Sequence, residues 1–286
     1  MPTVSDARPL SVPEGIHLLL RDLIHDRTGI FFENGRTDLL VEKLRDRVLV
    51  HRCQSYLDYY YILKYEEKGP DEWLRVMDAF SVQETYFWRE LSQIEALVQR
   101  VVPERFESQH SPLRIWSAAC ATGEEPYSIV IALLEAGLGH LPIEINASDA
   151  SEAALAKARA GIYRERSFRS LPLHLREKYF TRVGEQWQLG SAVMRRVKFH
   201  RANIVVAEDI AQLSRAAVIF CRNVFIYFSA DSIRRTVGIF ARQMTGRAHL
   251  FVGSSESLLK LTDDFELQEI GNAFVYMRTI RNTEGT

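Results

Sequence analysis

The spacing of the apolar residues changes partway along this chain, and the change limits the folds that the chain can adopt. From Ile16 to about Arg100 the apolar residues recur every three or four positions, as in Leu40 and Leu44, which is typical of amphipathic helices. Glycine and proline interrupt the pattern, most clearly at Gly69-Pro70, and indicate short connections between helices. We therefore expect an all-helical N-terminal domain, which we place at residues 1–92.

Beyond that region, short apolar runs alternate with helical segments. The expected strands are, in chain order, 113–118, 143–147, 217–221, 249–252 and an edge strand at 274–277. Helical patterns follow the first two runs, at 125–136 and 151–160. This alternation predicts a parallel sheet with helices on both faces. Residues 93–286 are thus predicted to form a doubly wound α/β domain, with a small antiparallel β insertion at about 179–199.

Composition and residue spacing argue against several classes of protein. The 36 basic and 37 acidic side chains give a formal net charge of -1, which provides no overall attraction for nucleic acid or an anionic membrane. Cys53, Cys120 and Cys221 are far apart and form no C-x-x-C pair, so neither a disulfide framework nor a zinc cluster is expected. The apolar stretch at 16–24 is interrupted by charges and is too short to span a bilayer. We expect a cytoplasmic protein without a metal site or a targeting segment.

The stretch from Trp116 to Glu125 follows the first expected strand, where open parallel sheets bind ligands. Its small side chains would let a ligand approach the backbone, but it lacks the G-x-G-x-x-G spacing of dinucleotide sites. A ligand with an ammonium group, such as the methionine end of S-adenosylmethionine (SAM), would be matched by Glu124 or Glu125. Asp149 lies 26 positions beyond Gly123, about where Rossmann-like folds place an acid that binds ribose hydroxyls. Acids that cap the helices that follow would explain both features equally well.

Polar residues also interrupt two hydrophobic stretches. Arg222 and Asn223 follow the apolar run at 217–221, where buried polar groups require a partner. That partner could be a ligand, or it could be the backbone of a turn. The aromatic segment at 85–90 contains a single cation, Arg89, which is equally compatible with a packed helix whose cation reaches the surface.

Taken together, these motifs resemble those of the chemotaxis receptor methyltransferases, often called the CheR family. The similar segments are 85–90 (TYFWRE), 116–128 (WSAACATGEEPYS), 147–163 (ASDASEAALAKARAGIY) and 219–228 (IFCRNVFIYF). They occur in the same order as in the family, and the resemblance covers nearly the whole chain. It implies an α-helical domain joined to a Rossmann-like methyltransferase domain that carries a small β subdomain.

The resemblance also implies the cofactor and the residues around it. The methyl donor would be SAM, the product S-adenosylhomocysteine, and no metal would take part. The side chains implied to line the cofactor site are Gln83, Thr85, Arg89, Ala119, Glu125, Asp149, Asn203, Ile204, Arg222 and Asn223. Arg89 and Tyr227 are implied to lie nearest the transferred methyl group and form the expected catalytic pair. The chain departs from many members at Gln83, where they have asparagine, and at Ser254, where they often have histidine.

The implied substrate is glutamate on the cytoplasmic helical bundle of a chemoreceptor, which exposes acidic surface. We expect basic residues of an N-terminal helix to dock on it; these are Lys43, Arg45, Arg47 and Arg52, with Arg36 and His51 nearby. The alternative is a solvated helix face, because acidic residues lie on the same helix. The protein is expected to act as a monomer recruited to receptor arrays, without nucleic acid or membrane insertion. The short β insertion argues against capture of a receptor C-terminal peptide.

Other functions remain to be weighed. A noncatalytic module that binds SAM or a receptor is the main alternative, although Arg89, Glu125, Asp149 and Tyr227 are all present. Methyltransferases that act on a base amino group would show N-P-P-Y or D-P-P-Y where Asn223 is followed by valine. Cytosine C5 enzymes would usually show a cysteine after proline, and NAD-dependent dehydrogenases would show the glycine fingerprint.

Overall fold

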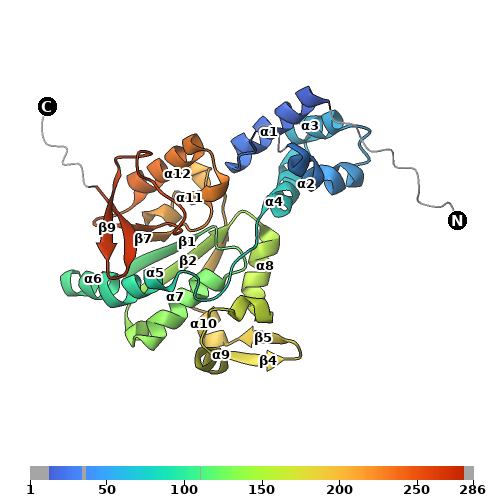
Figure 1. Ribbon diagram of the computed structural model, residues 1–286. Helices are drawn as coiled ribbons and strands as arrows, with labels where there is room; N and C mark the ends of the chain where they lie inside the picture. The colour runs from blue at the N-terminus through green and yellow to red at the C-terminus, as the bar shows by residue number, and fades with distance from the viewer. Residues whose placement is uncertain (1–12, 34–36, 110, 280–286) are drawn as a thin grey trace, which may run out of the picture. The chain divides into compact units, whose positions relative to one another are not determined.

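The computed structural model describes residues 13–33, 37–109 and 111–279, and the chain divides into two compact units between Ser81 and Val82 (Figure 1). The division lies earlier than the boundary expected after residue 92. Residues 82–92 belong to the second unit because their backbone is bonded to it: Phe87 N donates to Ser167 O at 2.9 Å, and Trp88 N donates to Ser128 Oγ at 3.1 Å.

The first unit is helical, as the sequence predicts. Its helices are α1 (Glu14–Thr28), α2 (Thr37–Val50), α3 (Tyr56–Tyr65) and α4 (Gly69–Phe80). Gly29 ends α1 in the left-handed conformation, with φ of 78°. Ser55 and Asp58 begin α3 with a reciprocal capping box, and Pro70 occupies the first turn of α4. The apolar faces of all four helices close around one core, which includes Leu20, Ile24, Leu40, Leu44, Tyr59, Trp73 and Val76.

A buried carboxylate, Glu72, joins three of these helices. Arg47 donates to both of its oxygens, from Nε at 2.8 Å and from Nη2 at 2.6 Å. Tyr59 donates its hydroxyl at 2.6 Å, and His51 Nε2 lies 2.7 Å from Oε2. Burial alone would raise the pKa of Glu72, but these hydrogen bonds outweigh it and lower the pKa to about 2. The carboxylate is therefore held ionised inside the helical unit.

We predict that Glu72→Gln lowers the unfolding free energy of the helical unit by about 3 kcal/mol, because Arg47 loses its buried counter-charge. Native-state hydrogen exchange in α2 and α4 would measure this separately from the second unit. The stabilisation by Glu72 should be complete above the ordinary glutamate pKa of 4.5 and be lost as the pH falls to about 2. Glu66→Gln removes an exposed pair with Lys68 and should have little effect. Equal protection in the two variants would contradict this role.

The second unit is built on a seven-stranded sheet with the order β6-β2-β1-β7-β8-β10-β9. Its strands are β1 (Leu113–Ala118), β2 (Ile143–Asp149), β6 (Val197–Arg201), β7 (Val218–Phe220), β8 (His249–Phe251), β9 (Phe265–Ile270) and β10 (Ala273–Arg278). The first five strands in the spatial order are parallel, whereas β10 is antiparallel to both β8 and β9. The run at 274–277, expected at the edge, is therefore an inner strand, and β9 forms the edge.

Helices cover both faces of this sheet, which confirms the predicted doubly wound domain. The helical segments are α5 (Leu91–Ala96), η1 (Leu97–Val101), α6 (Val102–Ser108), α7 (Glu124–Glu135), α8 (Glu152–Ala160), α11 (Ala207–Ile210) and α12 (Ala230–Gln243). Alternate residues of β1 face opposite ways: Ile115 packs in one core with residues of α7, and Trp116 packs in the other against Phe240 of α12. Within the part of the chain that the structure describes, no helix is long and apolar enough to cross a membrane.

A separate three-stranded sheet, ordered β3-β5-β4, forms the predicted antiparallel insertion. Its strands are β3 (Ile162–Tyr163), β4 (Phe180–Val183) and β5 (Gln186–Leu189), and the helices α9 (Leu173–Tyr179) and α10 (Ser191–Met194) flank it. The insertion begins earlier than residue 179, since β3 follows α8 directly. Residues 197–199, expected in the insertion, belong instead to β6 of the main sheet.

Candidate active site

The sequence motifs come together at the carboxyl ends of neighbouring parallel strands. Ala119 follows β1, Asp149 ends β2, Arg222 follows β7 and Ser254 follows β8. These strands are adjacent in the sheet, so their carboxyl ends meet at one edge, where open α/β sheets bind ligands. Asn203 and Ile204 reach the same edge from β6, which pairs with β2.

The loop after β1 has a strained backbone that Asp149 holds in place. Ala119, Ala121 and Gly123 all have positive φ, at 55°, 48° and 91°. A side chain at Gly123 would lie 2.9 Å from the Cβ of Ala158. Asp149 Oδ2 accepts from Ala121 N at 2.9 Å, and Oδ1 accepts from Ser151 N at the same distance. Asp149 thus joins the loops after β1 and β2, while Ser151 caps α8.

The two glutamates that begin α7 have different surroundings. Glu124 accepts from Thr122 Oγ1 at 2.6 Å and from Ser167 Oγ at 3.0 Å, so it anchors the segment that contains Ser167. Glu125 accepts from Ser117 Oγ at 2.6 Å, and its other oxygen lies 3.6 Å from Arg222 Nε. Burial raises the pKa of Glu125, and the charge of Arg222 opposes this rise.

Arg222 is a buried cation between two carboxylates. Its side chain is 1% exposed, and it lies 3.6 Å from Glu90 Oε2 as well as 3.6 Å from Glu125 Oε2. Its Nη2 donates to the backbone oxygen of Arg89 at 2.5 Å. Among the described residues, Arg222 Nε has no hydrogen-bond partner. Two carboxylates around one guanidinium leave a net negative charge, which suits a positively charged ligand.

Sequence analysis missed two carboxylates that hold this edge together, Glu90 and Glu256. Glu256 accepts from the backbone N–H of Gly253 at 2.6 Å, of Asn223 at 2.8 Å and of Ile226 at 3.2 Å. It thereby joins the loops after β7 and β8. Both acids belong to segments that stand out in the sequence, but their spacing gives no sign that their partners would be backbone groups and distant side chains.

Glu90 holds the same two loops from the other side. It accepts from Asn223 Nδ2 at 3.2 Å and from Ser254, through N at 3.1 Å and Oγ at 3.2 Å. Ser254 is the position at which the sequence resemblance leads to an expectation of histidine in many members. The hydroxyl at this position contacts Glu90 directly.

The residues of the expected catalytic pair adjoin this network in the sequence, Arg89 next to Glu90 and Tyr227 next to Ile226. Arg89 is half-buried, donates from Nη1 to Glu84 O at 3.0 Å, and has its guanidinium 5.6 Å from the centre of the Tyr86 ring. Tyr227 ends the short helix η5 (Phe225–Tyr227) and is 38% exposed. The residue before it, Ile226, is fixed by Glu256. Both side chains are accessible to a substrate.

The remaining predicted site residues have less distinctive surroundings. Gln83 Oε1 accepts from Lys157 Nζ at 2.7 Å, and Thr85 is half-buried in the same segment. Asn203 Oδ1 accepts from Val205 N at 3.3 Å, and Ile204 is buried. Their roles stay predictions.

The basic residues expected to dock a receptor lie in the helical unit and differ in accessibility. Lys43 donates to Ala79 O at 3.1 Å, and Arg47 is bound to Glu72. Arg45 and Arg52 are exposed. The nearby Arg36 lies outside the described residues.

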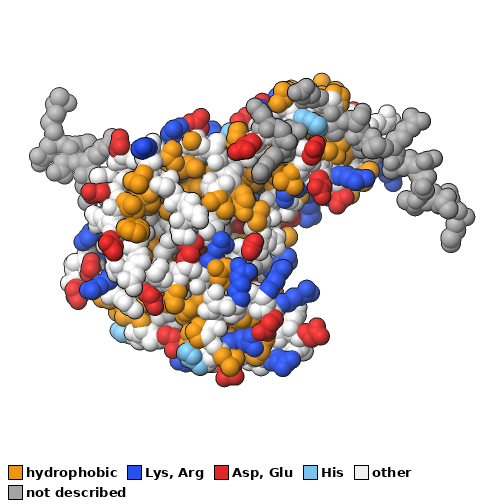
Figure 2. Space-filling model, in the orientation of Figure 1, with side chains coloured by type: hydrophobic (Ala, Val, Ile, Leu, Met, Phe, Trp, Pro, Cys, Tyr) orange, Lys and Arg blue, Asp and Glu red, His pale blue; other side chains and the backbone are white. Residues whose placement is uncertain are grey.

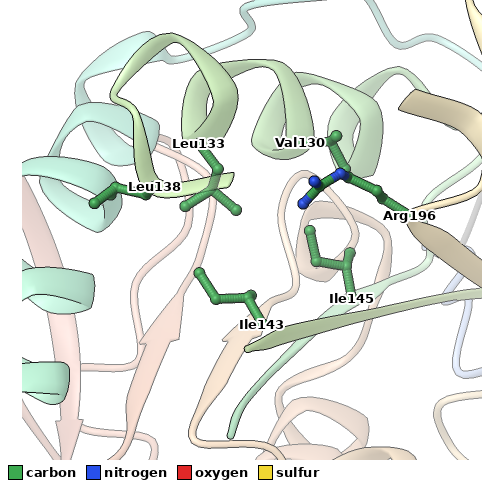
Figure 3. A pocket seen from close by; sticks show the side chains of 6 residues that line it. All are labelled: Val130, Leu133, Leu138, Ile143, Ile145 and Arg196. Atoms are coloured by element: carbon green, nitrogen blue, oxygen red, sulfur yellow. The ribbon is translucent and has the colours of Figure 1, made fainter. Parts of the chain in front are cut away.

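Figure 3 shows a pocket between α7, the turn η2 (Leu138–His140) and β2. It is lined by Val130, Leu133, Leu138, Ile143, Ile145 and Arg196. Its volume of about 10 Å³ is room for roughly one water molecule, so it cannot hold a cofactor. Ile143 and Ile145 lie in the first half of β2, away from Asp149. In the described residues, no group of three His, Cys, Asp or Glu side chains could hold a metal ion.

We predict that Gly253→Ala weakens SAM binding about tenfold, the loss of roughly one hydrogen bond. The added methyl would lie 2.5 Å from Asn223 Nδ2 and 2.9 Å from Asn223 N, so the loop must shift. Isothermal titration calorimetry with SAM would measure the change. Gly15→Ala is the matched control, because nothing lies within 4 Å of a Cβ there. Unchanged affinity in Gly253→Ala would show that Asn223 does not set cofactor affinity.

Comparison with known proteins confirms the resemblance seen in the motifs. Residues 18–81 match the all-alpha domain of CheR methyltransferases, and residues 83–274 match their SAM-binding domain. Chemotaxis protein methyltransferase 2 of Vibrio cholerae is 37% identical over 264 residues, which cover 90% of this chain and 91% of that protein. Chemotaxis protein methyltransferase 1 of Pseudomonas aeruginosa is 35% identical over 90% of this chain and 96% of that protein.

A further relative carries a different name. The Pseudomonas aeruginosa protein named "Probable biofilm formation methyltransferase WspC" is 35% identical over 76% of this chain and 52% of its own length. The two family matches together span both structural units and meet where the structure divides them. This chain therefore belongs to the CheR family of methyltransferases and uses S-adenosylmethionine.

Proposed function

We propose that this protein transfers a methyl group from SAM to the γ-carboxylate of glutamates on the cytoplasmic helical bundle of chemoreceptors. The products are a glutamate methyl ester and S-adenosylhomocysteine, and the reaction serves sensory adaptation. The observation that carries the proposal is Arg222 held between Glu90 and Glu125, because its net negative surroundings match a cationic methyl donor. The names of the chemotaxis relatives support the choice of receptor as substrate.

The residues present fit the cofactor. When bound, SAM supplies a methyl group on a positively charged sulfur. Glu125 is half-buried, and its Oε2 can accept from the cofactor's ammonium group. Arg222 Nε, which makes no hydrogen bond among the described residues, is a donor for the cofactor's carboxylate. Asp149, which accepts from the backbone N–H groups of Ala121 and Ser151, lies where Rossmann-like folds place an acid that binds ribose hydroxyls. The small residue Ala119 lets a ligand approach the loop backbone.

The substrate carboxylate needs no general base. Glutamate has an ordinary pKa of about 4.3 and is already ionised at neutral pH. A carboxylate oxygen forms the new bond to the methyl carbon as the carbon–sulfur bond breaks, and the bonding pair stays on sulfur. The enzyme contributes alignment, which can lower a barrier by roughly 7 to 11 kcal/mol when the geometry is right.

Arg89 and Tyr227 are the residues that we assign to this alignment. Arg89 orients the substrate carboxylate or the carboxylate of the cofactor. The hydroxyl of Tyr227 donates to an acceptor oxygen of the substrate. Strong hydrogen bonds to the substrate carboxylate would make it a weaker nucleophile. A single hydroxyl at a partly exposed position, such as that of Tyr227, therefore suits the role.

We place receptor docking on Arg45 and Arg52, which are exposed. We also propose that the protein acts as a monomer, in the cytoplasm, on receptor arrays. Lys43 and Arg47 also belong to the proposed docking set, but they bind groups within the helical unit. Charge reversal at those two positions would therefore disturb the fold together with any docking. Reversal at Arg45 and Arg52 is the cleaner test of the docking site.

The experiment that tests the function is transfer of labelled methyl from SAM to purified receptor cytoplasmic domains. Label that mild alkali releases as methanol would identify a carboxyl methyl ester, and mapping would place it on glutamate. Tight SAM binding without transfer to any receptor of a broad panel would favour the noncatalytic alternative.

We predict that Tyr227→Phe lowers kcat about tenfold or more and leaves the affinity for SAM within about twofold, because the hydroxyl acts on the substrate oxygen. Initial rates on a receptor fragment and calorimetry with SAM would separate the two quantities. Tyr61→Phe, at a residue that is 52% exposed in the helical unit, is the matched control. An unchanged kcat in Tyr227→Phe would reject this role.

A further inference from the structure

A cluster of cations lies beside the site on elements that the reaction itself does not use. Residues 152–169 contain five basic side chains and only two acidic ones. The five are exposed, and Figure 2 shows Lys and Arg side chains gathered over α8 and the segment that follows it. We call this the arginine surface; it consists of Lys157, Arg159, Arg164, Arg166 and Arg169.

The arginine surface is attached to the segment that carries Arg89. The guanidinium of Arg169 lies 3.7 Å from the centre of the Tyr86 ring, and that of Arg89 lies 5.6 Å from the same ring. Lys157 donates to Gln83 at 2.7 Å. Two separate contacts therefore place the cations next to the residue proposed to orient the substrate.

Only part of this positive charge is neutralised. Arg159 pairs with Glu152 at 2.5 Å, and Arg169 lies 3.4 Å from Glu84. Within the described part of the chain, Arg164 and Arg166 have no carboxylate within ion-pair distance. The other acid of the segment, Glu165, pairs with Arg176, at 2.5 Å. The surface thus keeps cations that an acidic partner can reach.

An exposed apolar residue lies among these cations. Ile162, in β3, is 45% exposed and precedes Arg164 by two positions. Arginine, tyrosine and an isolated apolar side chain are a composition typical of protein interfaces. The observations therefore favour a protein partner over a lipid surface.

We propose that the arginine surface binds the carboxylates that neighbour the accepting glutamate on the substrate helix, so that the enzyme selects acidic, unmethylated segments. The proposal rests on the proposed function and extends it to the substrate class. Each transfer converts a carboxylate into a neutral ester, so the attraction between the segment and the surface falls with every methyl group added. Binding through exposed charges also weakens with salt.

The test is Arg164→Glu/Arg166→Glu in the full chain, assayed on a receptor fragment with glutamate at its methylation positions. We expect kcat/KM to fall about tenfold at low salt, with a smaller salt dependence, while kcat and the affinity for SAM stay unchanged. Changing substrate residues next to the accepting glutamate from acidic to lysine should restore part of the lost kcat/KM in this variant. The same change should impair the unaltered enzyme.

The matched control is Arg215→Glu/Arg247→Glu, which makes the same charge change at exposed residues. These residues precede β7 and β8, at the amino ends of the strands. An equal fall in kcat/KM in the control, or an unchanged value in the first variant, would overturn the proposal. If the first variant loses SAM affinity, Arg164→Gln/Arg166→Gln replaces it under the same criteria.

Two further outcomes separate failure of the proposed function from failure of the proposed role of the arginine surface. If the unaltered enzyme methylates no receptor fragment, the proposed function itself fails. Vesicles of phosphatidylcholine with phosphatidylglycerol probe a lipid surface. Vesicle binding that is lost in Arg164→Glu/Arg166→Glu, with receptor methylation retained, would assign the surface to a membrane and overturn the proposal.

Discussion

The arrangement of the site depends on one buried cation, Arg222, and the carboxylates on either side of it. Its guanidinium cannot leave the protein interior without a large structural change, since its side chain is almost fully enclosed. Glu90 comes from the segment before α5 and Glu125 from the start of α7, so the cation draws two distant parts of the chain to the end of β7. A buried charge is tolerated only with such partners, and removal of one partner would leave the others uncompensated.

Acidic side chains organise this edge mainly through the backbone. Asp149 and Glu256 accept hydrogen bonds from main-chain N–H groups, and these bonds fix the loops after β1, β2, β7 and β8; the donors are Ala121, Ser151, Asn223, Ile226 and Gly253. Positive φ at Ala119 and Asn223 shows the conformations that these bonds maintain. A site whose donors and acceptors are already placed loses little free energy in reorganisation when a ligand binds.

The fold could be predicted from the sequence because hydrophobic spacing reports directly on burial. The helical unit, the strands β1 and β2, and the antiparallel insertion all follow from it. The boundary between the two units could not be predicted, because aromatic residues such as Phe87 and Trp88 could belong to the core of either unit. Only their backbone hydrogen bonds assign them to the second unit. The position of β10 inside the sheet likewise depends on pairing with β9, which local pattern does not encode.

For a similar reason, the sequence predicted some residues of the site and missed others. Arg222 and Asn223 were conspicuous as polar residues within an apolar run, and Asp149 followed a strand. Glu90 and Glu256 were not conspicuous, because acidic residues near loops are common. Their structural role depends on hydrogen-bond partners that lie far away in the sequence. Their roles emerge only when Asn223 is seen to donate to both of them, through its backbone N–H to Glu256 and through its side chain to Glu90.

That internal charge cluster has an implication for how such proteins diversify. Glu72, Arg47, Tyr59 and His51 satisfy one another within the helical unit, so its interior requires no ionic contribution from the methyltransferase domain. Exposed positions such as Arg45 and Arg52 can then vary without disturbing that interior. The buried charges of the helical unit would therefore stay paired if this unit were joined to a different catalytic domain.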